Sequence, residues 1–115
     1  MSKKTQLVIF NAAFLQLSLQ ADYYASREST QLASRWIAAV EYTINQILLM
    51  PQSHPCLSLG EQFPADLRRA VISGFPKHLL FYRYRPDDDV VRVVTILSGY
   101  MELEAALRQT AMTEQ

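Results

Sequence analysis

The stretch LASRWIAAVEYTINQILLMP, residues 32–51, holds the clearest helical pattern in the sequence. Its large apolar side chains recur every three or four residues, which places them on one side of a helix; they are Leu32, Trp36, Val40, Ile44 and Ile47. Polar side chains occupy the opposite side, and Pro51 ends the pattern. A helix with one apolar side must pack that side against another element, so the fold depends on the neighbouring segments.

The segments before this helix predict a strand and a second helix. Residues 6–10 include β-branched and aromatic side chains, which favours a strand, and Asn11 is expected to cap the helix that follows. Apolar side chains continue through that helix at helical spacing, at Phe14, Leu17, Ala21 and Tyr24. Residues 27–30 interrupt the pattern, and Ser29 or Thr30 is available to cap the next helix. Two helices joined so closely are expected to form an antiparallel hairpin.

The second half of the sequence predicts three strands. Residues 51–66 contain three of the five prolines and no periodic pattern, so they are interpreted as a loop. Three β-like segments follow, at residues 67–73, 78–85 and 90–97, separated by turn-like residues 74–77 and 86–89. Their short connections favour antiparallel pairing. Residues 101–112 predict a short C-terminal helix, with Leu103, Ala106 and Leu107 on one side.

The order of these elements predicts one α+β domain that spans residues 1–115. The expected architecture has an N-terminal strand, a helical hairpin packed on one face of a twisted antiparallel sheet, and a short C-terminal helix. The length suits a single core, because two independent cores would leave too few residues for each.

Composition excludes several kinds of site. The three glycines, Gly60, Gly74 and Gly99, cannot form the spacings of a phosphate-binding loop. Cys56 is the only cysteine, so no internal disulfide forms, and with His54 and His78 it supplies too few ligands for structural zinc. We therefore expect no metal and no cofactor. No apolar run is long enough to span a bilayer or to serve as a secretory signal, which predicts a cytoplasmic protein with no membrane partner.

Positive charge is concentrated in one part of the sequence, although the 11 basic and 11 acidic residues balance overall. Between residues 67 and 85 there is no acid and there are five bases: Arg68, Arg69, Lys77, Arg83 and Arg85. Strand alternation places Arg83 and Arg85 on one face, and His78, Leu80, Tyr82 and Tyr84 on the other. We expect a mixed basic and aromatic outer face that suits phosphate or an acidic peptide. The alternative is that these arginines only solubilise the strand and that residues 87–89 neutralise some of them.

Catalytic groups form no strong constellation. Cys56 and His54 belong to a proline-flanked loop, and His78 begins a strand, where a half-buried packing role competes with acid–base chemistry. Glu102 and Glu104 are two residues apart on the expected helix and face different ways. The aromatic residues of the two helices are interpreted as packing groups, namely Trp36, Tyr23 and Tyr24.

Several stretches resemble the RelE/ParE toxin superfamily, in its ParE-like branch. The helical part of the resemblance lies in ADYYA at residues 21–25, LASRWIAAVE at residues 32–41 and Met50-Pro51. The sheet part lies in Leu67-Arg68-Arg69, Gly74-Phe75-Pro76, LLFYR at residues 79–83 and Val91-Arg92-Val93. The resemblance implies the toxin of a type II toxin–antitoxin module. Such a toxin is held inactive by an antitoxin and acts either by inhibiting DNA gyrase or by cleaving mRNA on the ribosome, and the shared fold does not choose between them.

Comparison with the ribonuclease members of this superfamily leaves an incomplete set of residues. Where those members often have Arg, this sequence has His78, and where they have a basic residue and a His–Gly pair, it has Thr95 and Ser98-Gly99. Arg68, Arg83 and Tyr100 remain. Acid–base chemistry needs a titratable group within ~3 Å of the proton, so the sequence argues against a ribonuclease.

Three functions therefore stay under consideration. The first is a toxin that binds gyrase without chemistry, using Arg68, Arg69, Arg83 and Arg85 for charge and Tyr82 or Tyr84 for aromatic contact. The second is a ribosome-dependent endonuclease, with His78 and Tyr100 transferring protons and Arg68 and Arg83 binding phosphate. The third is an inactive relative that only binds antitoxin. In each case we expect an antitoxin partner, contacting the hairpin through an acidic amphipathic helix and the sheet through an extended segment, and no small-molecule substrate.

Overall fold

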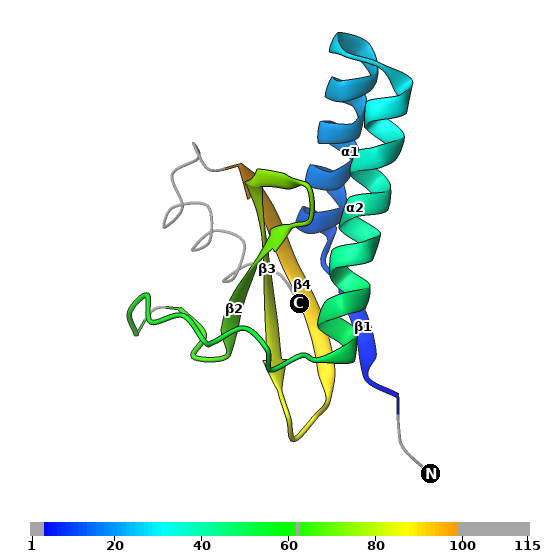
Figure 1. The fold of residues 1–115 in the computed structure, drawn as a ribbon. Coiled ribbons are helices and arrows are strands. Elements are labelled where there is room, and N and C mark those ends of the chain that lie inside the picture. The colour runs from blue at the N-terminus through cyan, green and yellow to red at the C-terminus, as the bar shows by residue number, and fades with distance from the viewer. Residues whose placement is uncertain (1–3, 62, 99–115) are drawn as a thin grey trace.

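The structure is a computed structural model that describes residues 4–61 and 63–98 and contains a helical hairpin beside a four-stranded sheet (Figure 1). The helices are α1 (Asn11–Arg27) and α2 (Thr30–Leu49), and the strands are β1 (Gln6–Ile9), β2 (Leu67–Ile72), β3 (Phe75–Arg85) and β4 (Val90–Ser98). This is the α+β arrangement that the sequence predicts. Neither helix is long and apolar enough to cross a membrane. The helix expected at residues 101–112 lies outside the described residues.

The four strands lie in the order β1-β4-β3-β2. Strands β2, β3 and β4 form the expected antiparallel meander, but β1 runs parallel to β4, with Gln6 opposite Val90 and Ile9 opposite Val93. The sheet is therefore mixed, and the expectation of a wholly antiparallel sheet is corrected. Only strands joined by a tight turn must be antiparallel, and the chain leaves β1 into the hairpin instead.

Helix α2 buries the apolar side that its sequence predicts. Trp36 and Val40 have no exposed surface, and the indole Nε1 of Trp36 donates a hydrogen bond to the Leu17 carbonyl of α1 at 3.1 Å. Of the two candidate caps, Ser29 is the N-cap, because its Oγ accepts a hydrogen bond from the Leu32 amide at 3.0 Å. These contacts fix α2 against both α1 and the sheet.

Helix α1 departs from the prediction at its start. Phe10 occupies the N-cap position without a side-chain hydrogen bond, and Asn11 is the first helical residue rather than the cap. Phe14, expected in the core, is 62% exposed, whereas Ala13 is 1% exposed. The two buried residues of α1 are Ala13 and Ala21, whose small side chains allow the helix to lie close to the sheet.

The β2–β3 connection is shorter than expected. The turn contains only Ser73 and Gly74, and β3 already begins at Phe75, so residues 75–77 belong to the strand. Gly74 has a φ of +80°, which suits glycine. Pro76 is tolerated in β3 because pairing with β4 begins only at His78, so its missing N–H removes no hydrogen bond to that neighbour.

A β-bulge in β4 shifts by one residue the alternation of its side chains between the two faces. Phe81 lies opposite Thr95 and Tyr82 lies opposite Val93, so Val94 is an extra residue. Val93 joins the core under the hairpin, whereas Val94 joins a second apolar cluster on the outer face with Phe10 and Phe63. The sheet thus has a helix-facing side and an outer face, each with its own apolar cluster.

Candidate functional site

Four arginines share the outer face of the sheet. Arg69 pairs with Phe81 and Arg83 pairs with Leu67, and both partners belong to the outer apolar cluster. Arg92 lies directly opposite Arg83, and strand alternation adds Arg85. We call this set, Arg69, Arg83, Arg85 and Arg92, the outer cationic face. The strand alternation that the sequence predicted for Arg83 and Arg85 is confirmed.

Two aspartates neutralise much of this face. The Arg83 Nε lies 2.9 Å from Asp66 Oδ1, and the Arg85 Nε lies 3.5 Å from Asp66 Oδ2. Asp88 Oδ2 lies 3.0 Å from Arg92 Nη1 and 3.3 Å from Arg85 Nη2. Desolvation alone would raise the pKa of the Asp88 carboxyl, but hydrogen bonds from Arg92 and the Val90 amide outweigh it and lower that pKa.

The expected surface of mixed arginines and tyrosines does not form. Tyr82 is 0% exposed, Tyr84 is 7% exposed and Arg68 is 8% exposed, and all three lie on the helix-facing side, where Arg68 pairs with Tyr82. The Tyr82 hydroxyl donates to the Pro51 carbonyl at 2.9 Å, and burial raises its pKa to about 12. The prediction that Tyr82 or Tyr84 offers aromatic contact on an exposed surface is therefore wrong. The prediction that Arg68 adds charge to that surface is wrong as well.

His78 lies in an aromatic cluster rather than beside an arginine. Its Nε2 is 3.0 Å from the Tyr24 hydroxyl, and its ring centroid is 4.7 Å from that of Trp36 and 6.3 Å from that of Phe75. Burial lowers the pKa of His78, which favours the neutral imidazole. A small cavity of about 190 Å³ adjoins this cluster, and Gln16 and Gln20 are among its lining residues.

The structure does not bring together the residues of the alternative catalytic set. His78 faces the helices, whereas Arg83 lies on the opposite face of the sheet in an ion pair with Asp66. Tyr100, the third member, lies outside the described residues. Ser98 pairs with His78 in the register of β3 and β4. Within residues 4–61 and 63–98, no three His, Cys, Asp or Glu side chains are placed to hold a metal ion.

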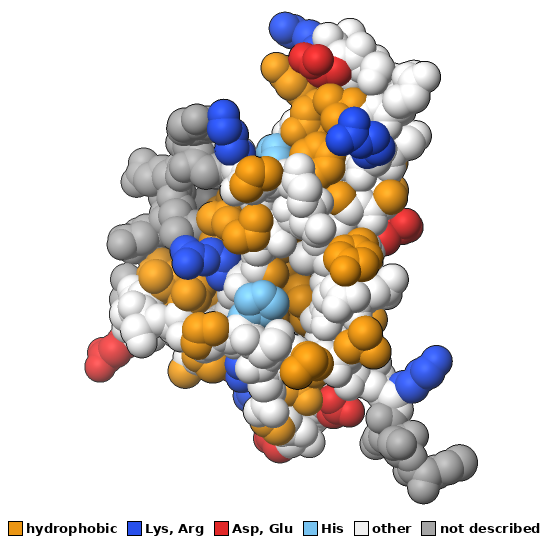
Figure 2. Space-filling view, viewed as in Figure 1, with side chains coloured by type: hydrophobic (Ala, Val, Ile, Leu, Met, Phe, Trp, Pro, Cys, Tyr) orange, Lys and Arg blue, Asp and Glu red, His pale blue; other side chains and the backbone are white. Residues whose placement is uncertain are grey.

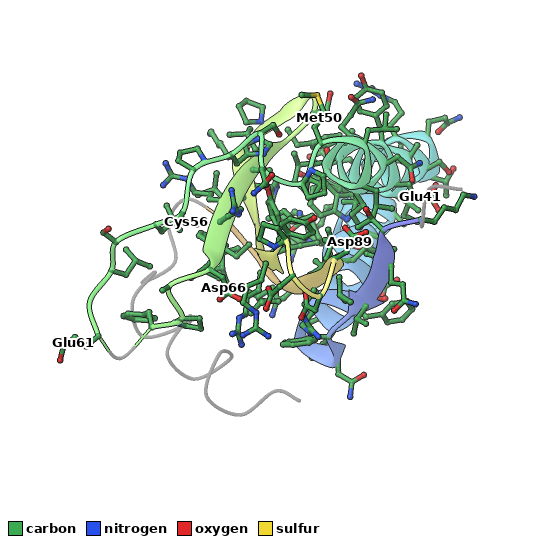
Figure 3. The ribbon with its side chains drawn as sticks, turned by 90° about the horizontal axis from the view of Figure 1, so that it is seen from below. Glu41, Met50, Cys56, Glu61, Asp66 and Asp89 are labelled. Atoms are coloured by element: carbon green, nitrogen blue, oxygen red, sulfur yellow. The ribbon has the colours of Figure 1, made fainter. Side chains whose placement is uncertain are left out.

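An apolar groove of about 390 Å³ runs between the hairpin and the β1 side of the sheet. Its lining includes Ile9 from β1, Phe14 from α1, and Ile37 and Ile44 from α2, and Glu41 is the charged residue that contributes to it. Figure 3 shows Glu41 on the helical side of the molecule. Beside the groove, β1 is an edge strand whose Leu7, Val8 and Ile9 are about two-fifths exposed, at 40%, 42% and 41%.

A comparison with known protein families shows which family the chain belongs to. Residues 9–103 match the family described as the ParE toxin of the type II toxin–antitoxin system, parDE. The chain belongs to the ParE toxin family. No curated protein sequence matches this ParE-family chain.

Solved structures share the fold of this ParE-family toxin. A structure of the chromosomal ParDE toxin–antitoxin system from P. aeruginosa matches at a TM-score of 0.67 and 12% identity, over 84% of this chain and 98% of that chain. A double Arg-to-Ala mutant of the E. coli toxin RelE in the free state matches at 0.58 and 12% identity, over 96% of each chain. The isolated E. coli RelE toxin matches at 0.55 and 11% identity, over 89% of this chain and 92% of that one.

The sequence led us to expect an antitoxin helix in an apolar groove along the hairpin of this ParE-family chain, but it did not locate the groove that α1, α2 and β1 form. The available signal is that α1 carries large apolar side chains besides its buried residues Ala13 and Ala21, because Phe14, Leu15 and Leu19 are 62%, 54% and 52% exposed. A helix that buries only one side needs no such residues elsewhere. Figure 2 shows hydrophobic side chains over the hairpin, and separate Lys and Arg side chains instead of one continuous basic patch on the face in view.

Proposed function

We propose that this ParE-family toxin inhibits DNA gyrase by binding, performs no chemistry itself, and is neutralised by a cognate antitoxin. The family match over residues 9–103 carries the proposal. Gyrase acts on DNA in the cytoplasm, so the proposal places the toxin there, and expression without antitoxin arrests growth. The outer cationic face supplies the charged contacts, through Arg69, Arg83 and Arg85.

The arrangement of titratable groups favours binding over ribonuclease chemistry. General acid–base catalysis requires the proton-transfer group within about 3 Å of its target and a cation near the developing charge. His78 is held against Tyr24 on one face, whereas Arg83 is paired with Asp66 on the other. The RelE-like fold keeps the ribosome-dependent endonuclease as a second candidate, and an inactive antitoxin-binding relative as a third.

The apolar groove supports an antitoxin partner. Ile9, Phe14 and Ile37 are large apolar side chains with 41%, 62% and 38% exposure, and they suit the apolar face of an amphipathic helix. Among residues 4–61 and 63–98, β1 pairs only with β4, so its other edge suits an added strand. The antitoxin is expected to be a short protein encoded beside this one, with a DNA-binding first half and an acidic amphipathic second half.

The test uses purified toxin, gyrase and relaxed plasmid. The wild type is expected to inhibit supercoiling and to trap gyrase–DNA cleavage complexes, and Arg69→Glu with Arg85→Glu is expected to weaken both by at least tenfold. Arg27→Glu with Arg35→Glu changes the net charge equally on the hairpin and serves as the control. Unaffected supercoiling at high toxin excess, with mRNA cleaved in a translating extract, would establish the endonuclease instead.

A further inference from the structure

Arg68 is a buried cation whose charge no acid balances among the described residues. It is 8% exposed, and its Nη1 donates to the His54 carbonyl at 2.6 Å. The ion pairs of the described chain join Arg83, Arg85 and Arg92 to aspartates, and none includes Arg68. The Tyr84 ring, 6.0 Å from the Arg68 guanidinium carbon, contributes only a cation–π contact.

One edge of the Arg68 guanidinium is unsatisfied. Its Nε is buried and has no hydrogen-bond partner. The hydroxyls of Tyr82 and Tyr84 donate to the Pro51 carbonyl and to Asp89, and neither oxygen lies within hydrogen-bond distance of this Nε. An unpaired N–H on a buried charge is unfavourable, and an acceptor at this edge would remove the penalty.

Arg83 shows within the same sheet what this edge of a guanidinium binds. Its Nε and Nη2 lie 2.9 Å and 3.4 Å from the two oxygens of the Asp66 carboxylate. Two parallel N–H groups match the two oxygens of a carboxylate or phosphate, and this bidentate geometry is specific to oxoanions. Arg68 has the same edge without the acid.

We propose that Arg68 forms a binding site for one oxoanion group, a carboxylate or a phosphate, beneath the loop between α2 and β2. The site is separate from the outer cationic face, since Arg68 faces the helices and Arg69, its neighbour in β2, faces outward. The proposal does not depend on gyrase as the target.

The loop between α2 and β2 covers the Arg68 Nε, so an oxoanion can reach this atom only if the loop moves. Figure 3 shows the loop running from Met50, where α2 ends, to Cys56 beside β2. Cys56 forms a β-bridge with Arg68, and the hydrogen bonds to the Pro51 and His54 carbonyls hold the loop on the sheet. An oxoanion reaches Nε when the loop shifts outward. Because His54 belongs to this loop, the shift exchanges the Nη1 bond to its carbonyl for the bonds to the oxoanion.

Thermal unfolding with three salts tests the site. Wild type, Arg68→Met and Arg69→Met are unfolded in phosphate, in acetate and in chloride at equal ionic strength. At ten times the dissociation constant, the bound oxoanion is expected to raise the Tm of wild type and Arg69→Met by about 5 °C over chloride. Arg68→Met is expected to fold and to show no such rise, because replacing an unpaired buried charge with an apolar side chain removes a penalty.

The two oxoanions distinguish the source of the group. A rise only in phosphate assigns the site to a phosphate group, and a rise only in acetate assigns it to a carboxylate. Equal Tm values in all three salts for the wild type, or an equal rise in Arg68→Met, would overturn the proposal.

A measurement on the wild type alone guards against a variant that fails to fold. The Arg68 Nε–H signal in an NMR spectrum is expected to shift and saturate during titration with the effective anion. The Arg83 Nε–H signal is the internal control, because that group is already paired with Asp66. An Arg68 signal that stays fixed throughout the titration contradicts the site.

Discussion

Tyr82 joins the sheet to the loop after α2 through one hydroxyl group. Its ring has no exposed surface, and its hydroxyl donates to the Pro51 carbonyl at 2.9 Å. A part-buried carbonyl that loses its donor keeps a cost of desolvation.

The change Tyr82→Phe is therefore expected to lower the free energy of unfolding by about 1 to 3 kcal/mol. Urea denaturation followed by circular dichroism measures it. Tyr42→Phe is the matched control, because Tyr42 is 55% exposed, and it is expected to change stability by less than about 0.5 kcal/mol. Equal losses in the two variants would show that the hydrogen bond contributes nothing.

His78 makes stability depend on pH in a defined direction. Burial lowers the pKa of its imidazole below the ordinary value of 6.5, so the unfolded chain binds more protons than the folded chain just below pH 6.5. The stabilisation is complete above pH 6.5 and is lost as the pH falls from there towards the folded pKa.

His78→Asn removes this titration. The variant is expected to lose less stability than the wild type between pH 7.5 and pH 5, as measured by the urea midpoint at each pH. A wild-type slope in His78→Asn would mean that other groups cause the acid sensitivity.

At the level of single residues, the sequence correctly predicted which face of a strand each side chain occupies. It did not predict which acidic side chains pair with the arginines. Alternation correctly separated Arg83 from Tyr82, because a strand has a strict two-residue period. It could not show that Asp66 neutralises Arg83, since that acid lies 17 residues earlier in the chain. Nor could it show the burial of Arg68, which depends on where the loop crosses the sheet.

At the scale of the elements, the hairpin depends on the cap between its helices. Both Ser29 and Thr30 are suitable from sequence, and only the structure shows that Ser29 accepts from the Leu32 amide. The hydroxyl of Thr30 instead lies 3.4 Å from the Gln31 side chain on the exposed surface.

Ser29→Ala is expected to lower the free energy of unfolding by about 1 kcal/mol, because the first turn of α2 loses its acceptor. Thr30→Ala is expected to change it by less than about 0.5 kcal/mol. Chemical denaturation of both variants tests the assignment, and a larger loss in Thr30→Ala would reverse it.

The apolar groove gives a prediction about antitoxin capture. Phe14→Glu and Ile37→Glu place charge on an apolar lining and are expected to weaken binding of the antitoxin at least tenfold, as measured by calorimetry. Gyrase inhibition is expected to be unchanged, because the outer cationic face is on the other side of the sheet. Tyr42→Glu, at an exposed position that does not line the groove, is the control. Wild-type affinity in the groove variants would place the antitoxin elsewhere.

Element prediction succeeded where a pattern is long and failed at boundaries. The five-residue apolar pattern of α2 fixed both its length and its buried side. The start of α1 and the β2–β3 turn were misplaced, because Asn11 and Pro76 suit caps and turns by type. The bulge at Val94 leaves no trace in a run of β-branched residues.

At the scale of the molecule, the sheet separates two surfaces with different chemistry. The helix-facing side carries the apolar groove, the buried residues Arg68 and Tyr82 and the half-buried His78, while the outer face carries the paired arginines. The class and order of the elements followed from sequence. The parallel pairing of β1 with β4 did not, because strands far apart in the chain have no turn to fix their direction.

The stoichiometry of action tests most directly whether this toxin binds or catalyses. Increasing amounts of purified toxin are added to gyrase with plasmid, and in parallel to a translating extract, and trapped gyrase and cleaved transcripts are counted per toxin molecule. A binding toxin is expected to trap gyrase in proportion to its amount, to saturate near one toxin per site and to leave transcripts intact. Many cleaved transcripts per toxin molecule, with gyrase unaffected, would contradict the account.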